Sequence, residues 1–554
     1  MKKIKLFPLL LLLLFVMCAC APTNDDPNNQ DAGKDIEMIQ AAAPYALASS
    51  EAGKAVILNS DGVPQIMLSA LLRTDLLQSA DFLKPSETED YFAIAAQTGM
   101  NTMDIVITWR EVEPSKDSYV FDGVDSYLAF AKKYNMKLNV VWYGSFVDGE
   151  THTANIPSYV ADDTDTYPVI ADLFDYAYYG RCRIMDWSNA NLLAREQKAL
   201  YNLMNHVADW NANNDNYNPV VTVQTGQGVD RLQRWRVEAY EITENGEKMT
   251  SDRAWSLAQS YVNAMGKGVK FSKYKALTRV EFCEQNAVVN YVRDIEKLEY
   301  VDIVCPTYLH EISSTKNGIK SFADEYEDMP VINAENWASD INYKQILATF
   351  GMGASGYVSY QLSCPNFFPE PPNGALYGRY NADGATLAEK FEQIGNRADT
   401  TKAINDALTK AYVAVANAPR KNFATLGLNN LLNSKQGEER IQKLYFANGI
   451  LLTFDNPDDS VGFAVYDSNY LYVYVSTDAT LTIDNCTVVV AQKGSFGSDG
   501  EWTSQGNVTL ADNKTLSAQA GEVYRVRLGE ISSLPSASEL KANGYLSLLD
   551  SIRG

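Results

Sequence analysis

Eight short apolar runs, most of them followed by a helix-like segment, are the feature that most limits how this chain can fold. Between the runs lie amphipathic stretches such as residues 192–210 and 252–267. Regular alternation of strand and helix over about 300 residues favours a closed α/β (β/α)₈ TIM barrel over an open sheet. The runs are residues 65–71, 101–109, 137–143, 219–225, 275–282, 301–308, 330–335 and 354–360.

The C-terminal part follows a different pattern. From Ile441 the apolar residues alternate with polar ones at a period of two, and turn residues separate the runs. This pattern predicts an all-β domain, and we expect a sandwich. The expected division is a leader at 1–20, a polar tether at 21–50, the barrel at 51–416, a linker at 417–437, the β-sandwich at 438–530 and a C-terminal extension at 531–554.

The N-terminus has the pattern of a targeting segment. Lys2, Lys3 and Lys5 precede an apolar stretch, residues 6–16, that is too short to span a bilayer. Ala19-Cys20 follows, and a polar segment comes next, which is typical of a bacterial lipoprotein acylated on Cys20. We therefore expect a lipid-anchored protein of the bacterial cell envelope, on the outer surface or in the periplasm. The alternative is an ordinary secretory signal with incidental cysteines.

Composition narrows the possible partners. The net charge of −22 makes nucleic acid a poor partner for the folded part. The five cysteines beyond Cys20 are scattered, and the chain has only three His, so we expect neither a disulfide framework nor a metal site. The Gly226-Gln227-Gly228 stretch lacks the third glycine and the Lys of a phosphate-binding loop. The sequence therefore predicts no cofactor.

The ends of the predicted strands are rich in aromatic, amide and carboxylate side chains. Catalytic and binding groups of TIM barrels lie at these ends, and polar groups on aromatic walls suit a hydroxyl-rich ligand such as an oligo- or polysaccharide. For each aromatic residue the alternative is a place in the barrel core. The candidate substrate-binding residues are Arg73, Trp109, Glu113, Trp142, Tyr143, Gln224, Gln227, Tyr308, His310, Trp337 and Tyr360.

Glu335 is the strongest catalytic candidate. The stretch "PVINAENW" reads as a buried strand that ends in this carboxylate, between Ala334 and Asn336. Glycoside hydrolysis uses two carboxyl groups, one as nucleophile or base and the other as acid. The alternative is a structural Glu that bonds to the backbone or pairs with Arg279.

Residues 97–146, "QTGMNTMDIVITWREVEPSKDSYVFDGVDSYLAFAKKYNMKLNVVWYGSF", resemble the second and third strand units of glycoside hydrolase families 35 and 42. These families are β-galactosidase-like TIM barrels, some with a β-sandwich behind the barrel. The likeness extends more diffusely over residues 62–529 and implies a retaining glycosidase. The matching positions are Gly99, Asn101, Thr102, Trp109, Glu113, Pro114, Phe121 and Asp122.

The resemblance implies one catalytic residue and leaves another missing. Glu335 corresponds to the family's nucleophile, and Glu113 corresponds to a residue that shapes the pocket. In "VQTGQGVD", Gln224 matches the first residue of the family's acid/base motif, but Gly228 stands where the acid/base Glu belongs. Candidates for a displaced acid are Asp230, Glu281 and Glu284.

Three hypotheses follow. The first is a glycosidase for β-linked, galactoside-type glycans that uses a displaced acid. The second is a carbohydrate-binding lipoprotein that has lost turnover, because a general acid contributes roughly 10²–10⁴-fold to such a reaction. The third is a structural protein without a ligand, which the aromatic strand ends disfavour.

Overall fold

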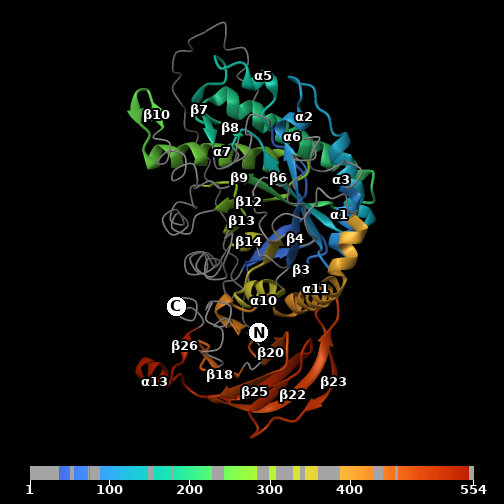
Figure 1. The fold of residues 1–554 in the computed structure, drawn as a ribbon, viewed down its shortest axis with the longest axis vertical. Helices are drawn as coiled ribbons and strands as arrows, with labels where there is room; N and C mark the ends of the chain where they lie inside the picture. The colour runs from blue at the N-terminus through green and yellow to red at the C-terminus, as the bar shows by residue number, and fades with distance from the viewer. Residues whose placement is uncertain are drawn as a thin grey trace, which may run out of the picture.

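The computed structural model describes residues 36–49, 55–72, 74, 88–146, 155–175, 180–226, 242–282, 298–306, 329–336, 343–359, 387–427, 441–455 and 460–547. For 173–175, 180–182, 335–336, 343–345 and 387–400 it describes the backbone alone. These residues form a barrel and, beyond it, a pair of antiparallel sheets (Figure 1).

The barrel confirms the fold class predicted from the eight apolar runs. All eight strands are parallel, in the order β13-β12-β9-β6-β5-β4-β15-β14, and a bridge between Val304 and Val331 joins the two ends of this order. The strands are β4 (Met67–Leu72), β5 (Thr102–Thr108), β6 (Lys137–Tyr143), β9 (Val220–Gly226), β12 (Leu277–Phe282), β13 (Ile303–Pro306), β14 (Ile332–Asn336) and β15 (Gly356–Ser359).

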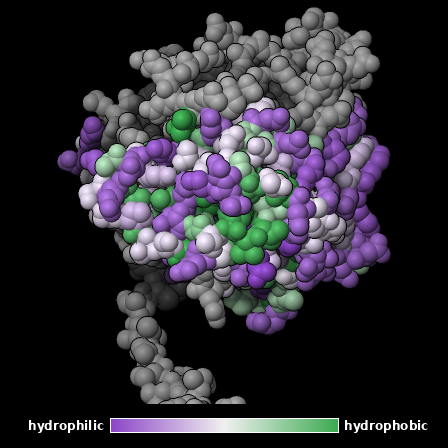
Figure 2. Space-filling view, turned by 90° about the horizontal axis from the view of Figure 1, so that it is seen from below, coloured by the Kyte–Doolittle hydropathy of each residue, from purple (hydrophilic) through white to green (hydrophobic). Residues whose placement is uncertain are grey.

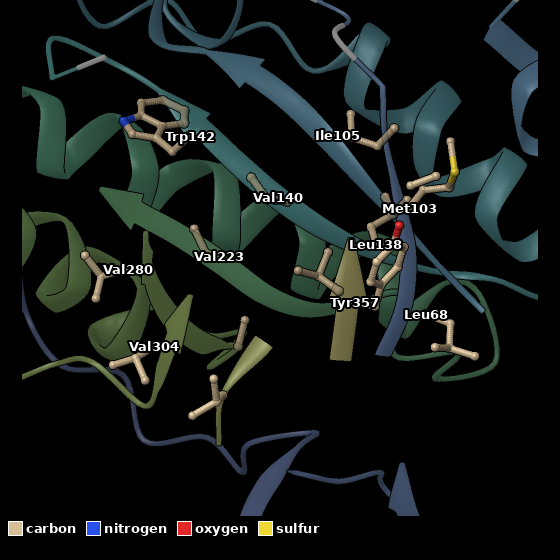
Figure 3. Packing of buried hydrophobic residues seen from close by; sticks show 14 of the residues in the cluster. Leu68, Met103, Ile105, Leu138, Val140, Trp142, Val223, Val280, Val304 and Tyr357 are labelled. Carbon is tan, nitrogen blue, oxygen red and sulfur yellow. The ribbon is translucent and has the colours of Figure 1, made fainter. Parts of the chain in front are cut away.

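The strands are buried on both faces because helices cover the outside of the barrel and side chains fill its inside. Figure 3 shows part of the outer cluster, in which Val140, Val223 and Val280 lie on three neighbouring strands. Asn189 and Thr250 cap the two long helices α6 and α7, which lie between barrel strands. The helices are α1 (Thr88–Gln97), α2 (Trp109–Val112), α3 (Asp122–Lys133), α5 (Ser158–Ala161), α6 (Ala190–Ala212), α7 (Ser251–Phe271), α10 (Tyr343–Gly351) and α11 (Leu387–Val415).

The segments that follow the third and fourth barrel strands, β6 and β9, contain small hairpins. β7 (Val169–Asp175) pairs with β8 (Gly180–Met185) in the first, and β10 (Thr243–Glu244) pairs with β11 (Glu247–Lys248) in the second. Both follow a strand's C-terminal end, which is the end of a TIM barrel that carries function. These segments therefore lie on the side of the barrel where we look for a site.

A three-stranded sheet closes the opposite end of the barrel. It consists of β1 (Ala46–Ser49), β2 (Ala55–Leu58) and β3 (Pro64–Gln65). An Asp61-Gly62 turn, a residue pair typical of hairpins, joins β2 to β3, and Gly62 has φ of +76°. Tyr45 and Ile57 belong to the apolar cluster inside the barrel, and the Tyr45 hydroxyl donates to the carbonyl of Asn218 just before β9. The N-terminal sheet therefore covers the end of the barrel at which the strands begin.

Lys137, the first residue of β6, gives a test of this closed end. Its ammonium donates to the carbonyl of Tyr217 and lies 3.4 Å from the centre of the Tyr217 ring, and burial lowers its pKa to about 8. Between about pH 8 and 10.5 the unfolded chain therefore binds a proton that the folded chain does not, so this group adds stability as pH rises. Urea unfolding should therefore show that the free energy of unfolding of Lys137→Met falls relative to that of the wild type as pH rises across that window. An equal change in the exposed variant Lys248→Met would contradict this.

The C-terminal region is a β-sandwich, as predicted. One sheet has the order β16-β19-β20-β25-β22-β23 and the other β24-β21-β18-β17-β26, and their inner faces share one apolar core. The strands are β16 (Phe423–Leu426), β17 (Ile441–Tyr445), β18 (Leu451–Asp455), β19 (Gly462–Tyr466), β20 (Tyr470–Val475), β21 (Ala479–Asp484), β22 (Cys486–Phe496), β23 (Trp502–Val508), β24 (Thr515–Ala518), β25 (Val523–Ile531) and β26 (Leu546–Ser547).

Two strands of the sandwich lie outside the segment 438–530 that we expected to form it. β16 lies in the expected linker and pairs with β19, and β26 lies in the expected extension and pairs with β17. The extension also holds a short helix, α13 (Ala537–Ala542), capped by Ser536. Short strands of four and two residues carry too little alternation to be recognised, and their partners define them.

The barrel and the sandwich share a core. Phe350 of α10 packs against Phe463 of β19 with ring centres 4.5 Å apart, and the Thr425 hydroxyl of β16 donates to the carbonyl of Ala348. In Figure 1, α10 and α11 lie between the two domains.

Figure 2 views the sandwich end, where hydrophilic residues surround a small apolar patch. Among the described helices, none has the length and apolar character of a membrane span.

Candidate functional site

The structure describes only some of the residues that the sequence assigned to the site. Trp109, Glu113, Trp142, Tyr143, Gln224 and Glu281 are described in full, and Glu335 as backbone at the end of β14. Outside the described residues lie Cys20, Arg73, Gln227, Asp230, Glu284, Tyr308, His310, Trp337 and Tyr360, together with Gly228.

Gln224 and Glu281 meet near the C-terminal ends of two adjacent strands, β9 and β12. The Gln224 amide Nε2 donates to Glu281 Oε2 over 2.7 Å, and the two side chains are 2% and 1% exposed. The Gln224 Oε1 atom is buried and has no hydrogen-bond partner among the described residues. The sequence had proposed the first residue for substrate binding and the second for acid catalysis, and the fold brings them together.

Closer to the N-terminal ends of the strands than this pair, five adjacent strands each contribute one polar side chain to a layer in the barrel interior. The Asp104 carboxylate on β5 accepts from the Ser69 hydroxyl at 2.6 Å and the Asn139 amide at 2.7 Å, and Asn139 in turn accepts from Thr222 at 2.9 Å. Arg279 on β12 completes the layer through an ion pair with Asp104. This network was missed from sequence, although a lone Asp inside the apolar run "NTMDIVITW" was the available signal.

Arg279 is therefore the partner of Asp104 within the described structure. Burial lowers its pKa, but the Asp104 carboxylate together with other nearby acidic groups more than compensates, so the pKa of Arg279 lies above its ordinary value. The guanidinium is charged and 1% exposed. Cys305 on β13 lies in the same interior, and burial raises the pKa of its thiol to about 12, so it is neutral. The expected alternative, a pair between Arg279 and Glu335, falls on a side chain outside the described set.

Glu113 lies beyond β5 and is fully buried. Its carboxylate pairs with Arg195 of α6 and accepts from the Asp117 backbone N–H at 2.9 Å and from the Trp109 indole at 3.0 Å. Arg195 also donates to the Tyr159 hydroxyl of α5 over 3.0 Å. These bonds fasten the segment after β5 to the helices α5 and α6. A role for Glu113 in shaping the pocket stays a prediction.

A second buried carboxylate, Glu196 of α6, supports the end of β6. It accepts from the Trp142 indole at 2.9 Å, the Ser145 N–H at 3.1 Å and the Tyr261 hydroxyl at 2.5 Å. The Ser145 hydroxyl also bonds to it and accepts from the Trp187 indole. Burial raises the pKa of Glu196, against these hydrogen bonds.

Gly144 makes this close approach possible. A β-carbon at that position would lie 1.6 Å from Glu196 Oε1, so any other residue there would displace the Glu196 carboxylate. The sequence reading did not select Glu196, since a Glu in an amphipathic helix is ordinarily a surface residue.

The three described aromatic candidates lie in the core. Trp109 and Trp142 pack in the cluster outside the strands, and Tyr143 packs in the cluster inside the barrel. Their part in stacking on a sugar stays a prediction. In the described part of the chain, no three His, Cys, Asp or Glu side chains gather in a way that could hold a metal ion.

No protein-family model and no curated protein matches the sequence. Among solved structures, the chain is similar to the exo-β-1,4-mannosidase Op5Man5 from Opitutaceae bacterium strain TAV5, with a TM-score of 0.40 and 11% identity over 56% of this chain. That alignment spans 54% of the mannosidase, about half its length.

Two further structures extend the comparison. A β-glucosidase from Thermotoga maritima in complex with glucoimidazole has a TM-score of 0.40 and 10% identity, over 61% of this chain and 99% of its own. A family 39 glycoside hydrolase from Bacteroides cellulosilyticus WH2 has a TM-score of 0.39 and 10% identity, over 86% and 85%. The structural neighbours of this chain are thus named as glycoside hydrolases.

Proposed function

We propose that this protein is glycoside-hydrolase-like and acts on or binds β-linked, galactoside-type oligo- or polysaccharides. The observation that carries the proposal is the Gln224–Glu281 pair at adjacent strand ends of a TIM barrel, the place where such barrels keep their active sites. An amide beside a carboxylate offers hydrogen-bond donors and acceptors that suit the hydroxyl groups of a sugar. β14, a third barrel strand, reaches its end at Glu335 and Asn336.

In the proposed reaction, Glu335 is the nucleophile of a retaining glycosidase. Its carboxylate bonds to the anomeric carbon while the glycosidic oxygen leaves with a proton from an acid. Water then attacks the anomeric carbon, gives one proton to that same residue, which is now a base, and so frees the sugar and the Glu335 carboxylate. Asp230, Glu281 and Glu284 are the candidates for that acid. This assignment rests on the likeness of residues 97–146 to glycoside hydrolase families 35 and 42.

A second candidate function is sugar binding without turnover. The specific observation behind it is that β9 ends in Gln224, Thr225 and Gly226, so its described end carries no acidic side chain. A natural sugar leaving group needs protonation, whose loss slows hydrolysis by roughly 10²–10⁴-fold. The site would then hold a glycan and release it unchanged.

Two substrates separate these functions. Aryl β-glycosides of galacto, gluco and manno configuration need no proton on the leaving group, whereas natural β-linked disaccharides do. An active enzyme should cleave both, and Glu335→Gln should abolish both while the exposed variant Glu299→Gln leaves them unchanged.

The other outcomes are equally distinct. Slow cleavage of the aryl glycoside alone, accelerated by azide, would show a working nucleophile and a missing acid. Glycan binding by calorimetry without cleavage would favour the binding protein. Neither cleavage nor binding would contradict both functions.

We also propose that the mature protein is held at the bacterial cell envelope by a lipid on Cys20. The support is the basic, apolar and small-residue order of residues 2–20 and the polar segment that follows.

A further inference from the structure

Glu281 has charged neighbours that bear on its protonation state. Residues two apart on a strand face the same side, so Arg279 and Glu281 both lie on the inner face of β12, where each is 1% exposed. In the parallel sheet, Cys305 is the direct neighbour of Glu281 on β13. On the other side, Gln224 of β9 donates to the Glu281 carboxylate.

Only part of the Arg279 guanidinium takes part in its ion pair with Asp104. Its Nη2 group bonds to Asp104, but its Nε and Nη1 groups are buried and have no acceptor among the described residues. The Asp104 carboxylate also accepts hydrogen bonds from the Ser69 hydroxyl and the Asn139 amide. Among the described residues, part of the guanidinium charge is therefore not offset by a direct hydrogen bond.

The remaining charges around Glu281 act in known directions. The described titratable groups that face it are Arg279, Asp104 and the neutral Cys305 thiol. Burial and the Asp104 carboxylate favour the protonated form of Glu281, although Asp104 is itself paired with Arg279. Between Glu281 and Arg279 the electrostatic interaction is attractive. The attraction is mutual, so the guanidinium favours the ionised form of Glu281. The amide N–H of Gln224 also favours the carboxylate, because an N–H group can only donate.

We infer that Arg279 and Gln224 hold Glu281 as a carboxylate, so that Glu281 serves the site as a base or a charge-stabilising group and is not the missing proton donor. Arg279 and Gln224 are positioning residues in this scheme. The inference rests on the proposed sugar site and deepens it. Hydrolysis with acid assistance would then require Asp230 or Glu284, and without them the barrel would only bind or would cleave activated glycosides.

Infrared spectroscopy tests this directly. Difference spectra between the wild type and Glu281→Gln report the form of this one side chain, because carboxylate and protonated carboxyl groups absorb at separate frequencies. At about pH 7 the variant should lose a carboxylate band. Loss of a protonated carboxyl band at that pH would overturn the inference.

Glu196→Gln is the matched control. Glu196 is equally buried but accepts only from neutral donors, and burial raises its pKa. On acidification, Glu196 should therefore become protonated at a higher pH than Glu281. The reverse order would contradict a role for Arg279.

Two further variants separate the effect of the Arg279 charge on Glu281 from the effect of Arg279 on the structure of the barrel interior. Arg279→Lys keeps the positive charge and should leave the protonation of Glu281 almost unchanged. The double variant Asp104→Asn/Arg279→Met removes both charges of the ion pair. If Arg279 sets the charge state, the double variant should still raise the pH of Glu281 protonation, by up to about 1–3 units. An unchanged midpoint would contradict the role of Arg279.

These measurements need no substrate, so they are independent of the proposed function. A protonated Glu281 in a chain that cleaves glycosides would defeat the inference and leave the function standing. An ionised Glu281 in a chain that neither binds nor cleaves glycans would defeat the function alone.

Discussion

Replacing Arg279 by Met should lower the free energy of unfolding by about 3–5 kcal/mol, because it leaves the Asp104 carboxylate buried without its counter-charge. Asp104 is 2% exposed and lies in the middle of the barrel, so water cannot replace the guanidinium. Urea unfolding at neutral pH, with an unchanged dependence on denaturant, would measure the loss.

The double variant Asp104→Leu/Arg279→Met is the control for this prediction. Removing both charges eliminates the uncompensated carboxylate, so the double variant should be more stable than Arg279→Met. It should not reach the wild type, since Ser69 and Asn139 lose their acceptor. A double variant less stable than the single one would show that the pair itself contributes more than its isolated charges cost.

Replacing Glu196 by Leu should also cost about 3–5 kcal/mol. The carboxylate is the acceptor for four buried donors, the Trp142 indole, the Ser145 N–H, the Ser145 hydroxyl and the Tyr261 hydroxyl. Indole and backbone N–H groups cannot act as acceptors instead, so both would be left unsatisfied. Thermal or urea unfolding would measure the cost, and Glu196→Gln, which keeps one acceptor oxygen, should lose less.

The pH dependence of this effect follows from the raised pKa of Glu196. A carboxyl group whose pKa is higher in the folded protein contributes most below its unfolded value, about 4.5, and loses that contribution as pH rises through the folded value. The difference between wild type and Glu196→Leu should therefore be larger at acidic pH than at alkaline pH. The opposite trend would mean that Glu196 stabilises the fold mainly as an anion.

Local patterns predicted most of the architecture. The apolar runs that became β5, β6, β9 and β12 are long enough for their composition to indicate a strand. Gly62 and Asp61 indicated the turn at the closed end of the barrel, because few other pairs adopt that backbone. The strands β16 and β26 had no such signal, since two to four residues become a strand only by pairing with β19 and β17.

The candidate site was predictable in one respect only. The sequence located Gln224 and Glu281 at the ends of predicted strands, but 57 residues separate them, and their hydrogen bond requires that β9 and β12 lie side by side. The ion pair of Asp104 with Arg279 spans 175 residues. Glu196 looked like a surface residue of an amphipathic helix, and its burial depends on Gly144 of another segment.

The difference between the features that the sequence predicted and those that only the tertiary structure decided has a physical cause. Strand and helix periodicity, turns and caps are short-range preferences that a segment carries along its own length, and from them the barrel and the sandwich could be inferred. Which buried carboxylates meet a cation, and which meet only neutral donors, depends on contacts between distant strands that no local pattern encodes. The charge state of Glu281, and with it the chemistry open to this barrel, belongs to that second kind of information.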